Sequence, residues 1–123
     1  ELAAAMATGI PAQITLLHVF EPPNSMVGIV PGATVANELD RDRDAGRTLL
    51  VEATESLAHA GITNVSSVLV RGAPEAAILE HARDADLIVM GTHGRRGLDR
   101  ALLGSVAERI IRKAPCPVVT IHL

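Results

Sequence analysis

Apolar residues along this chain gather in short runs that are separated by longer amphipathic stretches. Four runs rich in branched residues predict buried strands at 14–20, 65–70, 87–90 and 118–123. Between the runs, helical spacing of apolar residues predicts helices over about 35–60, 74–84 and 105–114. Residues 1–9 are typical of the last turns of a further helix, because they end at a glycine.

Strict alternation of helices with apolar strands predicts an α/β fold, with a doubly wound parallel sheet and helices on both of its faces. The run 87–90 is apolar at every position, which indicates a strand covered on both sides. A length of 123 residues predicts one domain.

Local signals mark several helix boundaries and one weak point. Gly61 predicts the end of the helix over 35–60, and Gly46 is expected to weaken the middle of that helix. Ser105 and Glu108 have the S-x-x-E spacing of a capping box, which predicts that the last helix starts at Ser105 with the Ser105 hydroxyl as its cap. His18 lies within an apolar strand and is expected to be a core or edge histidine.

Composition and charge argue against several classes of protein. A formal charge of −3 is unusual for a general nucleic-acid binder, and Phe20 is the only aromatic residue on which a base would stack. Cys116 is the only cysteine, so neither an intrachain disulfide nor a cysteine zinc site can form. No apolar run reaches the roughly 20 residues of a membrane helix. We therefore expect a cytoplasmic protein that binds neither nucleic acid nor membrane, with no metal site made by protein side chains.

A glycine-rich segment, residues 91–97, follows the most apolar strand, and Gly104 and Ser105 open a helix soon after it. Ligands of parallel sheets bind beyond the carboxyl ends of the strands, and helix N-termini attract anions. Arg95 adds a cation near this position, as do Arg96 and Arg100. The segment predicts a phosphate-binding site; the alternative is a tight connection with solvated arginines.

The spacing of these glycines resembles a known motif. Gly91-x-x-Gly94, followed by nine residues and then Gly104-Ser105, has the spacing of the nucleotide-binding motif of the universal stress protein family. The strand before it, A-D-L-I-V-M-G-T-H-G, and the segment after it, S-V-A-E-R-I-I-R-K-A-P-C-P-V-V, are similar to that family as well. The resemblance covers nearly the whole chain and implies a Rossmann-like fold of the adenine nucleotide alpha-hydrolase type.

The resemblance also implies how a nucleotide would lie. Val19 would contact the adenine, and Met90 and Gly91 would contact the adenine and the ribose. The phosphates would be held in two places, by His93 and Gly94 and by the start of the last helix. The helix start comprises Gly104, Ser105 and Val106.

The implied ligand is ATP or another adenine nucleotide, with Mg²⁺ or Mn²⁺ bound through the phosphates. Members of the family typically dimerise by pairing their last strands, here residues 118–123. The family's first strand lies in the middle of a five-stranded sheet, and residues 1–123 contain only four strands. We therefore expect a single universal-stress-protein-like domain over 1–123 that is incomplete at its N-terminus.

The function that follows is that of a stress-response protein that binds ATP and acts as a homodimeric regulator or signalling module. An alternative is a dimeric interaction module of the same kind that binds no nucleotide. No residues are identified as catalytic, because no activated nucleophile or water-orienting carboxylate is apparent, so at most slow ATP hydrolysis is expected. A small α/β nucleotide hydrolase is the weakest of the three hypotheses.

Overall fold

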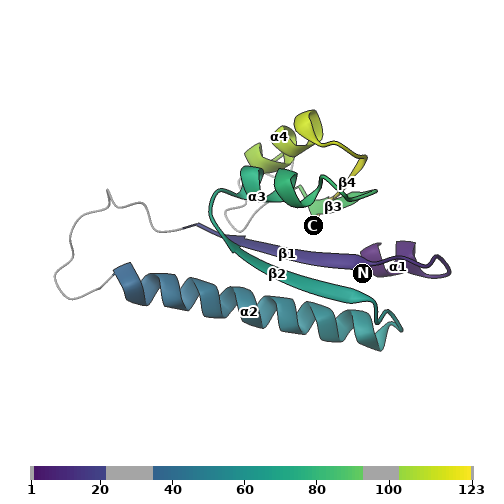
Figure 1. Cartoon of the computed structure of the whole chain (residues 1–123), viewed down its shortest axis with the longest axis horizontal. Helices are drawn as coiled ribbons and strands as arrows, with labels where there is room; N and C mark the ends of the chain where they lie inside the picture. The colour runs from purple at the N-terminus through teal and green to yellow at the C-terminus, as the bar shows by residue number, and fades with distance from the viewer. Residues whose placement is uncertain (1, 22–34, 93–102, 123) are drawn as a thin grey trace. The chain divides into compact units, whose positions relative to one another are not determined.

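The computed structural model describes residues 2–21, 35–92 and 103–122, and its helices and strands alternate along the chain (Figure 1). The chain divides into two compact units, residues 1–73 and 74–123. Each unit contains one pair of parallel strands, which confirms the α/β fold class. The elements are α1 (Leu2–Ala7), β1 (Ile14–Phe20), α2 (Val35–His59), β2 (Val65–Arg71), α3 (Pro74–His81), β3 (Ile88–Gly91), α4 (Ser105–Lys113) and β4 (Val118–Ile121).

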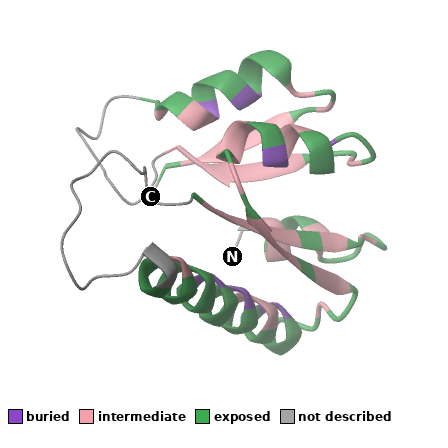
Figure 2. Cartoon of the chain, turned by 60° about the vertical axis from the view of Figure 1, so that its left-hand side comes forward, coloured by how far each residue is buried: buried purple, intermediate pink, exposed green. Residues whose placement is uncertain are grey.

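The first unit is built on the β1–β2 pair. The two strands pair in register from Ile14 with Val65 to Phe20 with Arg71. Parallel strands need a crossover connection, and α2 supplies it by packing lengthwise on both strands (Figure 1). Leu50 and Leu57, seven residues apart on one face of α2, are buried. The buried positions of α2 lie on the side of the helix that faces the strands (Figure 2).

At Gly46, the backbone of α2 lies close to side chains of both strands. A Cβ atom at this position would lie 2.6 Å from Cδ2 of His18 and 2.8 Å from Cδ1 of Leu69. The absence of a side chain therefore lets the helix backbone come down onto the imidazole of β1. The weakening that the sequence predicts at Gly46 is accompanied by a packing role that the sequence does not reveal.

The end of α2 agrees with the prediction from Gly61. This residue has a φ of +81°, which a glycine adopts without strain. Around it, the Ile62 amide donates to the Leu57 carbonyl at 2.9 Å, the pairing of a Schellman motif.

The second unit is built on the β3–β4 pair, which runs in register from Ile88 with Val118 to Gly91 with Ile121. Among the described residues of this unit, the buried side chains are small alanines and one large residue, Ile110, which is 0% exposed. Among the described residues, no strand pairing joins this pair to β1–β2. The buried alanines are Ala77, Ala82 and Ala107.

Glu75 links the first turn of α3 to the last turns of α4. Its carboxylate accepts a hydrogen bond from the Lys113 ammonium and another from Nη1 of Arg109 at 3.3 Å. The hydrogen bond from Lys113 is the main cause that holds the pKa of Glu75 below its ordinary 4.5, and the positive charges of Lys113 and Arg109 add to it. Each charge also suits its own helix terminus, acidic at the start of α3 and basic at the end of α4.

The contact at Gly46 gives a first prediction. An alanine would gain about 1 kcal/mol in helix propensity, but the overpacking against His18 costs about 1–3 kcal/mol. We expect Gly46→Ala to lower the free energy of unfolding by about 1 kcal/mol, measured by chemical denaturation with circular dichroism. Ala45→Gly, at the neighbouring exposed position, reports helix propensity alone. A Gly46→Ala protein more stable than the parent would show that α2 is not tightly packed on His18 and Leu69 at this position.

The ion pairs of Glu75 give a second prediction. Because the pKa of Glu75 is lowered in the folded state, its stabilising effect is complete above about pH 4.5 and is lost as the pH falls through the lowered value. We expect Glu75→Gln to be less stable than the parent at pH 7, with a difference that shrinks as the solution is acidified. Glu80→Gln, on the exposed side of α3, is the matched control. A difference that does not vary with pH would contradict the role of the charge.

Candidate functional site

The residues predicted to bind a nucleotide are spread over both units and beyond the described residues. In the second unit, Met90 and Gly91 end β3, and Gly104 precedes α4, whose first residues are Ser105 and Val106. Val19 belongs to the first unit, where it is half-buried in β1 and pairs with Val70. His93, Gly94 and Arg95 lie outside the described residues, as do Arg96 and Arg100.

Backbone hydrogen bonds of Thr92 bring the end of β3 and the start of α4 together. The Gly104 amide donates to the Thr92 carbonyl at 2.8 Å, and the Thr92 amide donates to the Ile121 carbonyl at 2.9 Å. Both ends of the segment that carries the predicted phosphate residues are therefore fixed at one place. That place is the carboxyl end of β3, where parallel sheets bind their ligands.

The start of α4 at Ser105 is as predicted, but its cap differs from the prediction. Gly104 is the N-cap, with φ −62° and ψ 149° and no side-chain cap, and the Glu108 amide donates to the Gly104 carbonyl at 2.9 Å. The capping box predicted from Ser105 and Glu108 is wrong, because the helix includes Ser105 as its first residue. The cap position holds a residue without a side chain, so no cap competes there for the first amide donors of the helix.

The charges on α4 follow the helix dipole. Its C-terminal half carries Arg112, which pairs with Glu108 at 2.7 Å, and the two cations that bind Glu75. The two pairs with Glu75 hold the basic end of α4 against α3, whereas the Arg112–Glu108 pair lies within α4. The N-terminal end of α4, with its partial positive charge, is left at the predicted site.

Two polar contacts, one at this site and one at the far end of α4, were not found by reasoning from the sequence. Thr92 stands between two predicted residues, and its Oγ1 lies 3.3 Å from Nδ1 of His122, which follows β4. Glu75 reaches Lys113 across 38 residues of sequence, so neighbouring residues give no signal of the contact. Thr92 did have a signal, since it lies inside the glycine motif.

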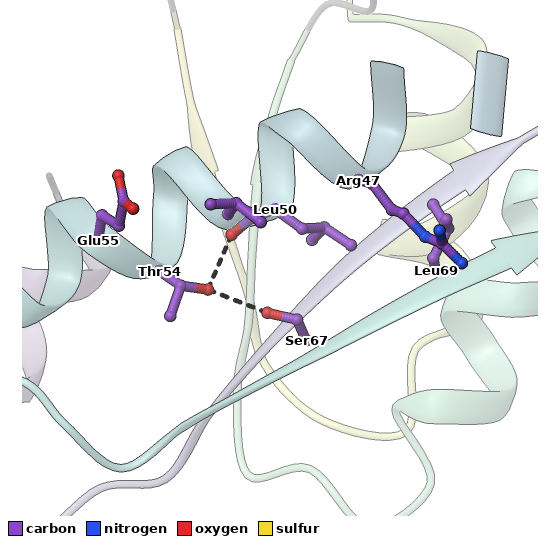
Figure 3. A pocket seen from close by; sticks show the side chains of 7 residues that line it. Arg47, Leu50, Thr54, Glu55, Ser67 and Leu69 are labelled. Atoms are coloured by element: carbon purple, nitrogen blue, oxygen red, sulfur yellow. Dashed lines mark hydrogen bonds between the residues drawn. The ribbon is translucent and has the colours of Figure 1, made fainter. Parts of the chain in front are cut away.

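A separate groove of about 380 Å³ lies in the first unit between α2 and β2 (Figure 3). Thr54 Oγ1 donates to the Leu50 carbonyl at 2.8 Å and lies 3.0 Å from the Ser67 hydroxyl oxygen. None of the predicted nucleotide residues lines this α2–β2 groove. Its lining residues are Arg47, Leu50, Val51, Thr54, Glu55, Ser67 and Leu69.

Within 2–21, 35–92 and 103–122, no three or more His, Cys, Asp or Glu residues are grouped so as to hold a metal ion. No helix of the same part of the chain is long and apolar enough to cross a bilayer.

Comparison with known proteins agrees with the motif. The model of the universal stress protein family matches residues 1–122. A universal stress protein of Thermus aquaticus is 31% identical over 123 residues, which is 98% of this chain and 85% of that protein. One from Methanocaldococcus jannaschii is 51% identical over 59 residues, and that match spans 46% of this chain and only 35% of the relative.

Solved structures share the fold. The universal stress protein UspA from Lactobacillus plantarum has a TM-score of 0.82 at 23% identity, covering 98% of this chain and 84% of that one. A universal stress protein in complex with cAMP has a TM-score of 0.66 at 26% identity, covering 98% and 82%. Since the family model spans almost every residue and a relative matches the chain along its length, this chain belongs to the universal stress protein family.

Proposed function

We propose that this stress-response protein binds an adenine nucleotide, with ATP as the preferred ligand, at the end of β3 and the start of α4. The observation that carries the proposal is the hydrogen bond from the Gly104 amide to the Thr92 carbonyl, at 2.8 Å. It joins the two ends of the Gly91-x-x-Gly94 and Gly104-Ser105 motif at the edge where such ligands bind. The cAMP complex of a 26% identical relative supports an adenine nucleotide.

The geometry refines the role of Gly104. Its amide is already used by Thr92, so the phosphates would take their hydrogen bonds from the next amides, those of Ser105 and Val106, and from the exposed Ser105 hydroxyl. Gly104 contributes by having no side chain where the phosphates must approach. Val19 against the adenine, and His93, Gly94 and Arg95 against the phosphates, remain predictions from the motif.

A divalent cation would be held by the nucleotide itself. Mg²⁺ prefers oxygen ligands and keeps several waters, so triphosphate oxygens suffice without a carboxylate cage. We therefore expect Mg²⁺ or Mn²⁺ to enter with ATP and to neutralise part of the charge on the phosphates.

We also propose that the protein forms a homodimer in the cytoplasm through residues 118–123. Within the described part of the chain, β4 pairs with β3 on one edge, and no strand covers the other. An uncovered edge of half-buried Val118, Val119 and Ile121 favours pairing with a second copy. As the resemblance implies, residues 1–123 would belong to one domain.

Gly104→Val tests the site. The φ of −62° and ψ of 149° at Gly104 suit valine, so the change adds bulk without straining the backbone. We expect ATP affinity, measured by titration calorimetry with Mg²⁺, to fall by at least about tenfold, a loss of about 1.4 kcal/mol. The circular dichroism spectrum and the dimer mass should not change.

Leu103→Val, at the preceding exposed residue, is the control and should bind as the parent does. Equal ATP affinity in the parent and Gly104→Val would refute the site. A parent protein that binds neither ATP, AMP nor cAMP would favour the nucleotide-free interaction module instead.

Arg95→Ala tests whether the loop recognises phosphate. If the Arg95 guanidinium meets the phosphates, its loss should weaken ATP binding by about threefold to tenfold at low ionic strength and less at high salt. Adenosine, which has no phosphate, should bind the variant as it binds the parent. An equal loss for both ligands would show that Arg95 does not contact phosphate.

A further inference from the structure

The exposed side of α2 carries an unusual stripe. Arg47, Val51 and Glu55 stand four residues apart, so they lie on successive turns of one helix face. All three are exposed and line the α2–β2 groove, in which Figure 3 labels Arg47 and Glu55. Val51 is 56% exposed although its side chain is fully apolar. No ion pair involves Arg47 or Glu55 among the described residues.

The strand beside this groove has an open edge. The Ile14 amide bonds to the Asn64 carbonyl and the Gly72 amide to the Phe20 carbonyl, so the even-numbered positions of β2 face β1. The backbone groups of Val65, Ser67 and Leu69 therefore point away from β1. No strand of the described chain pairs with that edge. β2 contains no proline, and its one charge, Arg71, stands at the C-terminal end of the strand, so positions 65–70 lack the residues that usually protect an edge.

This edge is self-complementary. If two copies pair antiparallel about a two-fold axis at Val68, Ser67 stands opposite Leu69 of the partner subunit as a hydrogen-bonded pair. Ser67 and Leu69 both face α2 in their own copy. Because opposed residues of antiparallel strands project to the same face of the sheet, the two copies of α2 would lie on one face.

The helix stripe is centred on the same axis. Thr54 lies against Ser67, and Val51 is three residues, or about 4.5 Å, further along α2. Val68 is one residue, or about 3.3 Å, further along β2 in the same direction, because helix and strand run antiparallel. Val51 and Val68 therefore stand at nearly the same level, and one axis passes close to both.

The charges then match across the axis. Arg47 and Glu55 are each four residues from Val51, so a two-fold operation sets Arg47 opposite Glu55 of the partner subunit, twice. Val51 meets its own copy between the two ion pairs. An apolar centre flanked by complementary charges is what an isologous interface requires.

The distances also suit packed helices. α2 packs on both strands of the pair, and its axis therefore lies over a point between them. Neighbouring strands are about 4.8 Å apart, so the added pairing would set the two α2 axes about 10 Å apart. Helices that pack against one another have interaxial distances of about 8–10 Å.

We propose that the outer edge of β2 together with the stripe Arg47, Val51 and Glu55 is a self-association surface whose occupant is a second copy of this chain. It differs from the β4 edge of the proposed function and lies in the other unit. A chain that uses both surfaces would assemble beyond a dimer, since each surface joins a different pair of copies.

The first experiment places a cysteine at the axis. In the full chain with Cys116→Ser, Val51→Cys should form a covalent dimer under mild oxidation about tenfold faster than Asp42→Cys, since the interface holds the thiols at high effective concentration. Asp42 is exposed and nine residues from Val51, a half-turn away around α2. Equal rates for the two cysteine variants would overturn the proposal.

The second experiment exchanges the charges and measures the Val51→Cys cross-linking rate. Arg47→Glu and Glu55→Arg each place like charges together and should slow cross-linking by about tenfold. The double variant restores opposite charges across the axis and should recover the parent rate. A double variant as slow as the singles would overturn the proposal.

Calorimetric titration with ATP on the same variants separates this proposal from the proposed function. None of the three stripe residues belongs to the glycine motif, so ATP affinity should not follow the cross-linking rate. If ATP still binds but Val51→Cys does not cross-link, the self-association surface has failed. If Val51→Cys cross-links but ATP does not bind, the proposed function has failed.

Discussion

The candidate site depends on one backbone hydrogen bond, from the Gly104 amide to the Thr92 carbonyl at 2.8 Å. Without it, the ends of a segment longer than ten residues would have to be brought together at the entropic cost of closing a loop. With it, the first turn of α4 stands at the carboxyl end of β3. The bond also uses the Gly104 amide, so the phosphate donors are the amides that follow.

Packing at the far end of α4 supports this arrangement. Ile110 is fully buried, and the alanines of α3 and α4 let the two helices pack closely in the second unit. Glu75 then fixes the basic end of α4 through Lys113 and Arg109. Because α4 is held at its C-terminal end, its N-terminal amides stay in place. Contacts that touch no ligand therefore help to position the donors of the candidate site.

The sequence predicted what depends on local pattern. The four strands, the long helix and its end at Gly61 follow from apolar periodicity and one glycine, and the motif located the β3–α4 connection. The prediction of Ser105 as the helix cap was wrong because both Gly104 and Ser105 suit an N-cap, and only backbone geometry decides between them. The contacts of Gly46 and of Glu75 join residues that are distant in sequence, and no local pattern contains them.

The first unit connects the predicted adenine position to α2. His18 lies under Gly46 of α2, and Val19, the next residue, projects to the opposite face of the β1–β2 pair. A base that presses on Val19 would act on the strand that supports α2 and its exposed stripe. By linkage, any effect of nucleotide on association through that stripe must equal the effect of association on nucleotide affinity. Such coupling would pass through the packing of α2 on β1 and β2, which includes the approach of Gly46 to His18.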